Sequence, residues 1–400
     1  MENINNTEIP NNNNYTENIK TKKSNLAIIV ISLLSIIIIF LIVLVAELYI
    51  QVHKSNIQLH SVKTTNKSVV YKQNQKNNIN PNIQGSWLSA NSLPQGVQDA
   101  TSIEYNGYIY EIGGAYEPSG VSLNSVYYSH INTNGTIGPW NSTTSFPSSI
   151  SLSTSVEYDG FIYEIGGCQS QSACPVSSVY YAIINSNGTI GQWNSTTALP
   201  VTISESTSVE YGGFIYEIGG CQSQGACPVS SVYYAIINSN GTIGQWNGTT
   251  ALPVPISPSA SVEYDGYIYE IGEYSNLRTS IFPVYYSKIN TNGTIGQWNS
   301  ATSLPQSTFS VSAVEYAGYI YEIGGDNSTN SSGLSPTNIY YSKINSNGNL
   351  SSWKSTTTPP NSSATYGNNV LVYNGYIYQI GGYGYIPGST PSANVYYAKL

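Results

Sequence analysis

Charge is scarce in this chain, and most of it is negative. Only 8% of the 400 residues are charged, and from residue 85 onward five lysines and arginines stand against 17 acidic residues, a net charge of −12. A nucleic-acid-binding surface needs clustered cations to contact the phosphates. We therefore expect no nucleic-acid partner, and we expect solubility to depend on neutral polar side chains.

Histidine is also scarce, and only His130 occurs beyond residue 85. Ser-His-Asp catalysis requires a histidine base, and most copper or zinc sites take histidine ligands. A pair of carboxylates could in principle hydrolyse a glycosidic bond without histidine. From this composition we predict no catalytic residue, no metal ligand set and no cofactor.

The chain has four cysteines, which fall into two close pairs. Cys168 and Cys174 lie in one expected loop, and Cys221 and Cys227 lie in another. The spacing lacks the histidine neighbours of a zinc site. We predict two disulfides, each within one loop, which is typical of an oxidising exterior. Four free thiols are the alternative.

Long apolar runs are absent except at residues 26–46, where only Ser32 and Ser35 interrupt 21 residues. As a helix this run would be about 31 Å long, enough to cross a bilayer. We predict one transmembrane helix within 25–50 that acts as a signal anchor. A cleaved signal peptide is the alternative, although its apolar region is normally about 7–15 residues.

Lysines flank the apolar run unevenly, with Lys20, Lys22 and Lys23 close to its N-terminal side. This bias predicts a cytoplasmic N-terminus and an extracellular remainder, so we expect a single-pass protein of the cell membrane. Residues 1–24 are rich in asparagine and are predicted to be a disordered tail. Residues 51–84 are polar and are predicted to be a flexible stalk.

Beyond residue 85 a short motif returns at a fixed interval. The segment 108–114 reads Tyr-Ile-Tyr-Glu-Ile-Gly-Gly, and close copies follow at 161–167, 214–220, 267–273, 319–325 and 376–382. One tryptophan accompanies each copy, from Trp87 to Trp353. A period near fifty residues indicates a stacked or radial repeat.

Each unit has the pattern of four antiparallel strands. Residues 101–105 and 108–112 flank Asn106-Gly107, a strong signal for a two-residue hairpin turn. A third strand begins near Ser125, and Asn134-Gly135 leads to a fourth strand that carries Trp140. Four antiparallel strands per unit predict the blade of a propeller.

The two ends of the repeat complete each other. The last unit stops in its third strand at residues 395–400, and the missing fourth strand is found at Gly85-Ser86-Trp87. Pairing these segments closes the ring and leaves no exposed edge. We therefore predict an all-β fold, a six-bladed propeller over 85–400, preceded by one transmembrane helix.

The apolar strand, the Gly-Gly doublet, the tyrosine and the tryptophan of each unit resemble a Kelch-repeat propeller. The resemblance covers 85–400 and implies the six-bladed fold. Glu273 replaces the second glycine of the fourth unit, and the interval from Tyr128 to Trp140 is longer than the usual Kelch interval. Some Kelch-like propellers are copper oxidases, but that site requires histidine ligands.

The strand order predicts one uniform end and one variable end. The second-to-third-strand loops share the variable end with the links between blades, and binding residues normally lie on such loops. Arg278 is the only arginine, so we rank it first for an acidic or carbohydrate partner. The predicted ligand-binding residues of this rim are Arg278, Tyr274, Tyr116, Glu117, Phe282, Asp326, Tyr383 and Tyr385.

Two sets of glutamates recur at equivalent places, in first strands and in second strands. Ten buried carboxylates cannot be balanced by five cations, so we expect them to be hydrogen-bonded, protonated or bound to a cation such as calcium. The first set is Glu104, Glu157, Glu210, Glu263 and Glu315, and the second is Glu111, Glu164, Glu217, Glu270 and Glu322, with Gln379 in its sixth place.

Asn-x-Ser/Thr sequons are frequent in the expected exterior, and we expect several to be glycosylated. They are Asn66, Asn134, Asn141, Asn187, Asn194, Asn240, Asn247, Asn292, Asn327, Asn330, Asn349 and Asn361.

From these patterns we predict a cell-surface module that binds a surface protein or a glycan through its variable loops, in adhesion or envelope organisation. The alternatives are an extracellular carbohydrate-active enzyme on a propeller scaffold and a structural coat component. A convergent acid pair in a deep pocket would favour the enzyme.

Overall fold

The computed structural model describes residues 31, 33–35, 37–38 and 41, and residues 80–400 except 117–120, 171, 224, 273–281, 306–308, 327–337, 361–365 and 384–389. The chain divides into two compact units, Met1–Gln75 and Lys76–Leu400.

The first unit is described only at seven positions between 31 and 41, all helical. Their large apolar side chains are exposed, from 52% at Leu34 to 63% at Ile31. Among the described residues, no helix has both the length and the apolar character to cross a membrane. Most of the run 26–46, on which we predicted a transmembrane helix, lies outside those residues.

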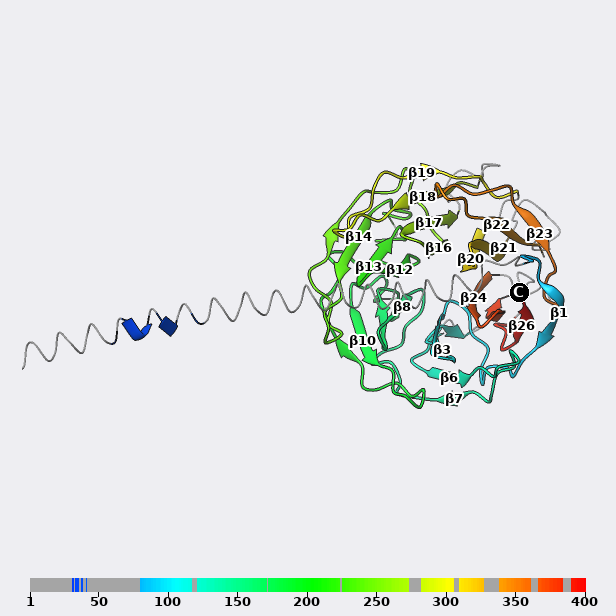
Figure 1. Ribbon diagram of the computed structural model, residues 1–400. Coiled ribbons are helices and arrows are strands. Elements are labelled where there is room, and N and C mark those ends of the chain that lie inside the picture. The colour runs from blue at the N-terminus through cyan, green and yellow to red at the C-terminus, as the bar shows by residue number, and fades with distance from the viewer. Residues whose placement is uncertain are drawn as a thin grey trace, which may run out of the picture. The chain divides into compact units, whose positions relative to one another are not determined.

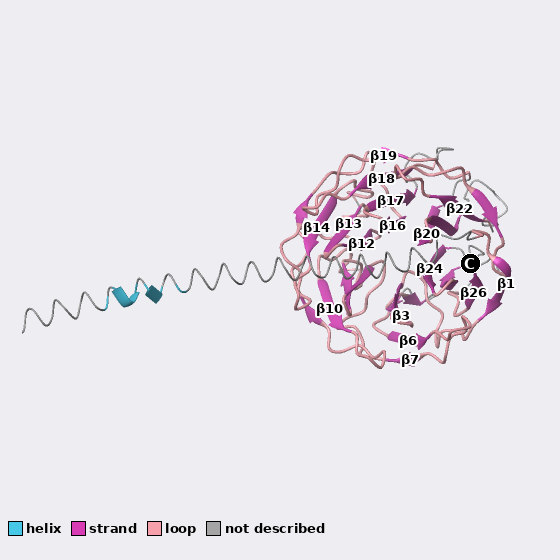
Figure 2. Cartoon of the chain, viewed as in Figure 1, coloured by secondary structure: helices cyan, strands magenta, loops and turns pink. Residues whose placement is uncertain are grey.

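The second unit is a ring of six four-stranded antiparallel sheets in the described part of the chain, and the predicted six-bladed propeller is confirmed (Figure 1). Almost all of its regular structure is strand, joined by loops (Figure 2). Each blade runs outward from its first strand. Blade 1 contains β2 (Thr101–Tyr105), β3 (Tyr108–Ile112), β6 (Val126–His130) and β7 (Asn141–Ser142).

The next four blades repeat this order. Blade 2 contains β8 (Thr154–Tyr158), β9 (Phe161–Ile165), β10 (Val179–Ile183) and β11 (Asn194–Ser195), and blade 3 contains β12 (Thr207–Tyr211), β13 (Phe214–Ile218), β14 (Val232–Ile236) and β15 (Asn247–Gly248). Blade 4 contains β16 (Ser259–Tyr264), β17 (Tyr267–Gly272), β18 (Val284–Lys288) and β19 (Asn299–Ser300), and blade 5 contains β20 (Phe309–Tyr316), β21 (Tyr319–Asp326), β22 (Ile339–Lys343) and β23 (Lys354–Thr356).

Blade 6 joins the two ends of the repeat, as predicted. It contains β24 (Tyr366–Tyr373), β25 (Tyr376–Tyr383), β26 (Val395–Lys399) and, as its outermost strand, β1 (Gln84–Ser89). β1 pairs antiparallel with β26, so that Leu88 lies opposite Tyr397. The blue-cyan β1 therefore lies beside the red β26 (Figure 1).

The first hairpin of each blade turns as the sequence predicts. Asn106 has a φ of 51° and Gly107 a φ of 82°, and the equivalent pairs of the other blades are also left-handed. Positive φ at both central residues gives the two-residue turn whose twist matches the strands. Asparagine, aspartate and glycine adopt this conformation readily, whereas Ala317 holds it with a φ of 54°.

Each tryptophan connects its blade to the preceding one. Trp193 Nε1 donates to the carbonyl of Thr144 at 3.2 Å, and Trp246 Nε1 donates to that of Thr197 at 3.0 Å. In every blade the acceptor lies four residues after the tryptophan of the preceding blade. We predicted that Trp140 lies in a fourth strand; it lies just before β7, and its indole donates to Asn91 O at 2.9 Å.

The closing seam repeats the contacts of the ordinary seams. Trp87 Nε1 donates to Thr357 O at 3.0 Å, and Ile83 N donates to the Thr356 hydroxyl at 3.1 Å. The latter bond matches that from Ile190 N to Thr143 Oγ1 at 2.8 Å. Residues 270 positions apart in the chain thus meet as neighbouring blades do.

The hydrophobic core lies between blades as six separate clusters in the described residues. One cluster joins Tyr216 and Ile218 of blade 3 to Ile268 and Trp298 of blade 4. Because each blade contributes to two clusters, no blade can bury its apolar surface alone.

Trp87 and Leu88 give a test of the closing seam. Trp87 is 4% exposed and Leu88 is 52% exposed. Trp87→Ala should lower the free energy of unfolding by about 3–5 kcal/mol, the usual cost of deleting a buried tryptophan, and Leu88→Ala should change it by less than about 0.5 kcal/mol. Urea denaturation measures both. Equal effects would contradict the closure.

Ala317 and Gly212 occupy the same turn position in different blades. Ala317→Gly should stabilise the protein by about 1 kcal/mol, because a left-handed conformation is costly for a residue with a Cβ. Gly212→Ala should destabilise it by a similar amount, since a Cβ at Gly212 meets nothing within 4 Å and the cost is purely conformational. Thermal unfolding measures both effects. Melting temperatures that shift in the same direction in the two variants would contradict this account.

Candidate functional site

The two ends of the propeller differ as expected from the strand order. At one end, the link after each blade pairs with the second-to-third-strand loops, as in the bridges between Ser151 and Cys168 and between Val176 and Ile203. We call this end the loop face. At the other end, Ile131 N donates to Gly107 O, so the two turns of a blade lie together. We call this end the hairpin face.

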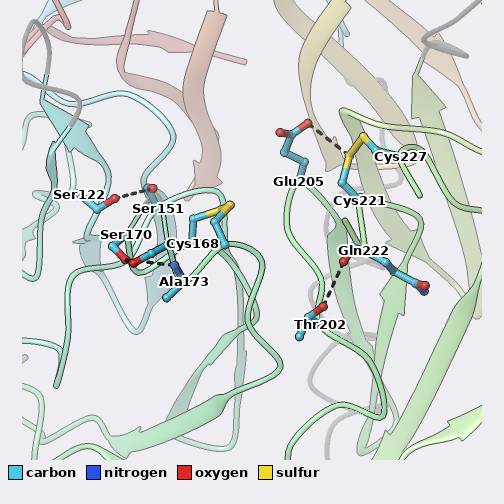
Figure 3. The surroundings of a disulfide bond; sticks show 12 residues. Ser122, Ser151, Cys168, Ser170, Ala173, Thr202, Glu205, Cys221, Gln222 and Cys227 are labelled. Carbon is cyan, nitrogen blue, oxygen red and sulfur yellow. Dashed lines mark hydrogen bonds between the residues drawn. A yellow bond between two sulfur atoms is a disulfide. The ribbon is translucent and has the colours of Figure 1, made fainter. Parts of the chain in front are cut away.

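Blades 2 and 3 place the same disulfide loop twice on the loop face. Cys168 is bonded to Cys174, and Cys221 to Cys227, which confirms the predicted pairing (Figure 3). Segments 161–201 and 214–254 differ only at Ser172, where blade 3 has Gly225, and at Ser195, where it has Gly248. Two nearly identical surfaces therefore lie on adjacent blades.

Hydrogen bonds fix these loops to the neighbouring links. The backbone of Cys168 pairs with that of Ser151 in both directions, at 2.8 and 3.0 Å. The Thr202 hydroxyl donates to the Gln222 carbonyl at 3.1 Å (Figure 3). Each loop is thus held by a disulfide and by the link that follows or precedes its blade.

Glu205 lies next to the second disulfide (Figure 3). Its carboxylate accepts a hydrogen bond from the Ser257 hydroxyl at 3.3 Å, and Cys221 Sγ is 3.8 Å away. Burial raises the pKa of this carboxyl, and the Ser257 hydrogen bond partly opposes the rise. Glu205 and both cysteines are spaced like metal ligands, but sulfurs joined in a disulfide offer no thiolate.

A partial circle of left-handed residues lies on the loop face, one near the start of the first strand of every blade except blade 4, which has Pro258 there. Asp99, Leu152 and Glu205 have φ values of 55°, 53° and 53°. Leu152 N donates to Asp99 O, and Glu205 N donates to Leu152 O, both at 2.9 Å. Ser310 and Gly367 are left-handed at the equivalent places. Our sequence reasoning missed this circle; its only signal is a fixed distance of eight residues before the hairpin glycine.

The described rim candidates come from four different blades. Tyr116 is 38% exposed at the end of β4 (Ala115–Tyr116), which pairs with β5 (Val121–Ser122). Tyr383 ends β25 and is half-buried, and Asp326 ends β21. Phe282 is 2% exposed in a core cluster, so packing alone accounts for it. The other candidates, Glu117, Tyr274, Arg278 and Tyr385, lie outside the described residues.

Second-strand glutamates bind polar side chains of the inner strands, and Glu111 and Glu164 bond across to the preceding blade. Glu164 accepts a hydrogen bond from Thr101 of the preceding blade at 3.1 Å and another from Ser153. Glu111 accepts from Asn369 of blade 6 at 3.3 Å. These glutamates are at most 2% exposed. Hydrogen bonds from neighbouring side chains thus hold Glu111 and Glu164, as the hydrogen-bonding alternative predicts.

The first-strand glutamates have a different role. Glu104 accepts a hydrogen bond from Gly107 N at 2.8 Å, and the other four bind their own turn glycine in the same way. Each of these glutamates therefore stabilises the first hairpin turn of its own blade. Burial raises the pKa of Glu104 to about 7 and that of Glu210 to about 8.

Desolvation also dominates the charge state of the second-strand ring. Burial raises the pKa of Glu111, Glu164 and Glu217 to about 8, against the opposing effect of hydroxyl hydrogen bonds. It raises that of Glu270 to about 7. Blade 6 has Gln379 at the equivalent position of its second strand. Gln379 lies opposite Val370, and in blade 1 Glu111 lies opposite Ser102. A neutral amide thus occupies the position that the acids occupy elsewhere.

No family model and no curated protein matches the chain. Among solved structures, that of YjhT matches with a TM-score of 0.58 and 15% sequence identity, over 76% of this chain and 95% of that one. At this identity the likeness shows the fold alone. The Kelch resemblance depends on the repeated residues themselves.

The ring predicts greater stability in acid. Because the folded-state pKa of Glu217 is about 8 against an ordinary value of 4.5, the stability it contributes is complete below about pH 4.5 and is lost as pH rises through about 8. One pKa unit corresponds to about 1.4 kcal/mol. Thermal unfolding between pH 4 and pH 9 should therefore show a falling melting temperature.

Two matched variants separate this ring from other titrating groups. Glu217→Gln should flatten the fall in melting temperature, and Gln379→Glu should steepen it. A pH profile that neither variant alters would contradict the assignment.

Proposed function

We propose that the protein is a membrane-anchored, cell-surface, Kelch-like propeller that binds a surface protein or glycan through its loop face. The role that fits this binding is adhesion or organisation of the cell envelope. The apolar run 26–46 and the lysines before it support the anchor and its orientation. Two disulfides support an oxidising exterior.

The observation that carries the proposal is the duplicated disulfide loop. Two adjacent blades present the same groups on one face, each fixed by a covalent bond and by backbone pairing. Two equivalent contacts on one rigid body raise overall affinity without strengthening either contact. Such a surface suits a repetitive ligand, such as a glycan chain or an array of surface proteins.

The chemistry of the described loop face favours a neutral or weakly charged ligand. Serine, threonine and glutamine side chains surround the two disulfides (Figure 3), and Asp99 and Glu205 lie near the axis. Hydroxyls and amides can exchange hydrogen bonds with sugar hydroxyls. We propose Arg278, Tyr274, Glu117 and Tyr385, together with Tyr116 and Tyr383, as further contacts.

We propose binding rather than catalysis because the observed carboxyl groups have structural partners. The first-strand glutamates cap turns, and Glu111, Glu164 and Glu217 bind hydroxyl or amide donors. His130 ends β6 beside Tyr108, at the hairpin face. A base–nucleophile pair built on this histidine would lie away from the variable loops.

Substituting arginine at Ser170 and Ser223 tests whether the loop face binds the ligand. These serines are exposed and occupy equivalent positions in the two disulfide loops. In a glycan and cell-surface-extract binding screen with the full-length chain, Ser170→Arg with Ser223→Arg should weaken binding at least about tenfold, equivalent to about 1.4 kcal/mol. Each single variant should have a smaller effect, because one loop remains.

The matched control places the same charges on the same blades but on short outer strands. Ser195 and Gly248 are exposed in β11 and β15, so Ser195→Arg with Gly248→Arg should leave binding unchanged. Loss of binding in this control, or its retention in the loop pair, would count against the loop face.

A further inference from the structure

Seven of the described sequons of the propeller fall into two structural classes, and Asn349 belongs to neither. The first class lies in the third-to-fourth-strand turns on the hairpin face and comprises Asn134, Asn187, Asn240 and Asn292. The second lies at the start of the short outer strands and comprises Asn141, Asn194 and Asn247. All seven side chains are exposed, so exposure does not distinguish them.

In the turn class, the hydroxyl of the sequon contacts its own asparagine. Thr189 Oγ1 donates to Asn187 Oδ1 at 2.7 Å, and Thr189 N donates to the same oxygen at 3.1 Å. The other three turns repeat both bonds. Within the described part of the chain, Nδ2 of these four asparagines donates no hydrogen bond to the protein.

In the strand class, both groups of the sequon are engaged elsewhere. Asn194 Nδ2 donates to Gln192 O at 2.9 Å, and Thr196 Oγ1 accepts from Ile243 N of the next blade at 2.8 Å. Asn141 and Asn247 have the same partners in their own blades and seams. Modification here would place a sugar on an amide nitrogen that already donates a hydrogen bond, and the hydroxyl already belongs to a blade seam.

We propose that the four turn asparagines carry N-linked glycans and that the three strand asparagines do not. The inference depends on the extracellular placement in the proposed function. The reaction joins the asparagine Nδ2 to C1 of a sugar supplied by a polyprenyl-phosphate-linked donor. The C1–O bond to the carrier breaks, its electron pair stays with the phosphate oxygen, and the nitrogen releases one proton.

The surroundings of the turns fit this assignment. Ile183 and Ile236 are 50% and 36% exposed on the hairpin face. Ile183 pairs with Phe161, and a Cβ on Gly241, next to Asn240, would meet that ring at 2.6 Å. A glycan on Asn240 would therefore lie beside the half-buried Phe161 and the exposed Ile183. Sugars on this face would leave the loop face uncovered.

Glycopeptide mapping of the full-length protein, purified from the cells that make it, tests the proposal. Chymotrypsin cleaves after tryptophan, and Trp140, Trp193 and Trp246 each separate a turn asparagine from the strand asparagine that follows. We expect glycan on the peptides with Asn134, Asn187, Asn240 and Asn292 and none on those with Asn141, Asn194 and Asn247. Unmodified turn peptides, or glycan on the strand peptides, would overturn it.

A pair of variants separates modification from turn structure. Thr189→Ser keeps the sequon and should keep the glycan on Asn187, whereas Thr189→Ala should lose one glycan from the intact mass. An unchanged intact mass in Thr189→Ala would contradict the proposal. Bare turns together with intact loop-face binding would overturn this inference alone, and glycosylated turns without that binding would overturn only the proposed function.

Discussion

The indole hydrogen bond between neighbouring blades is the contact on which the rest of this propeller depends. Each tryptophan donates to a carbonyl in the preceding blade, and the same bond joins the first tryptophan to the last blade. Because the apolar clusters lie between blades, the ring buries its core only when every seam is formed. The described links of the loop face run from one blade to the next and pair with its loops, so they depend on the same seams.

The inner strands add a second constraint near the axis. Buried acids would normally be unfavourable in a chain with so few cations. Here a threonine and an asparagine of adjacent blades donate to Glu164 and Glu111, and desolvation favours the neutral form of the buried acids. A glutamine in the sixth position fits the same environment. Hydrogen bonding and protonation, two of the three predicted accounts of these carboxyl groups, thus both fit the way the blades join.

Much of the fold could be predicted because its determinants are local and repeated. Asn106-Gly107 fixes a turn, Cys168 and Cys174 are close in the chain, and the segment at Trp87 supplies the strand that the last unit lacks. The circle through Asp99, Leu152 and Glu205 could not be predicted, since its members share a backbone conformation but no side-chain chemistry. Phe282 was predicted to lie on an exposed loop. The residues that bury it lie elsewhere in the chain, so its own neighbours in the sequence do not indicate its burial.

The position of β1 determines how the ring would respond to mechanical load. It is the outermost strand of blade 6, and it receives the chain directly from the N-terminal unit. Tension along that segment therefore acts first on the contacts of residues 81–83 with blade 5 and then on the pairing of β1 with β26. It pulls at the place where the ring was closed, and reopening it would expose the free edge of β26.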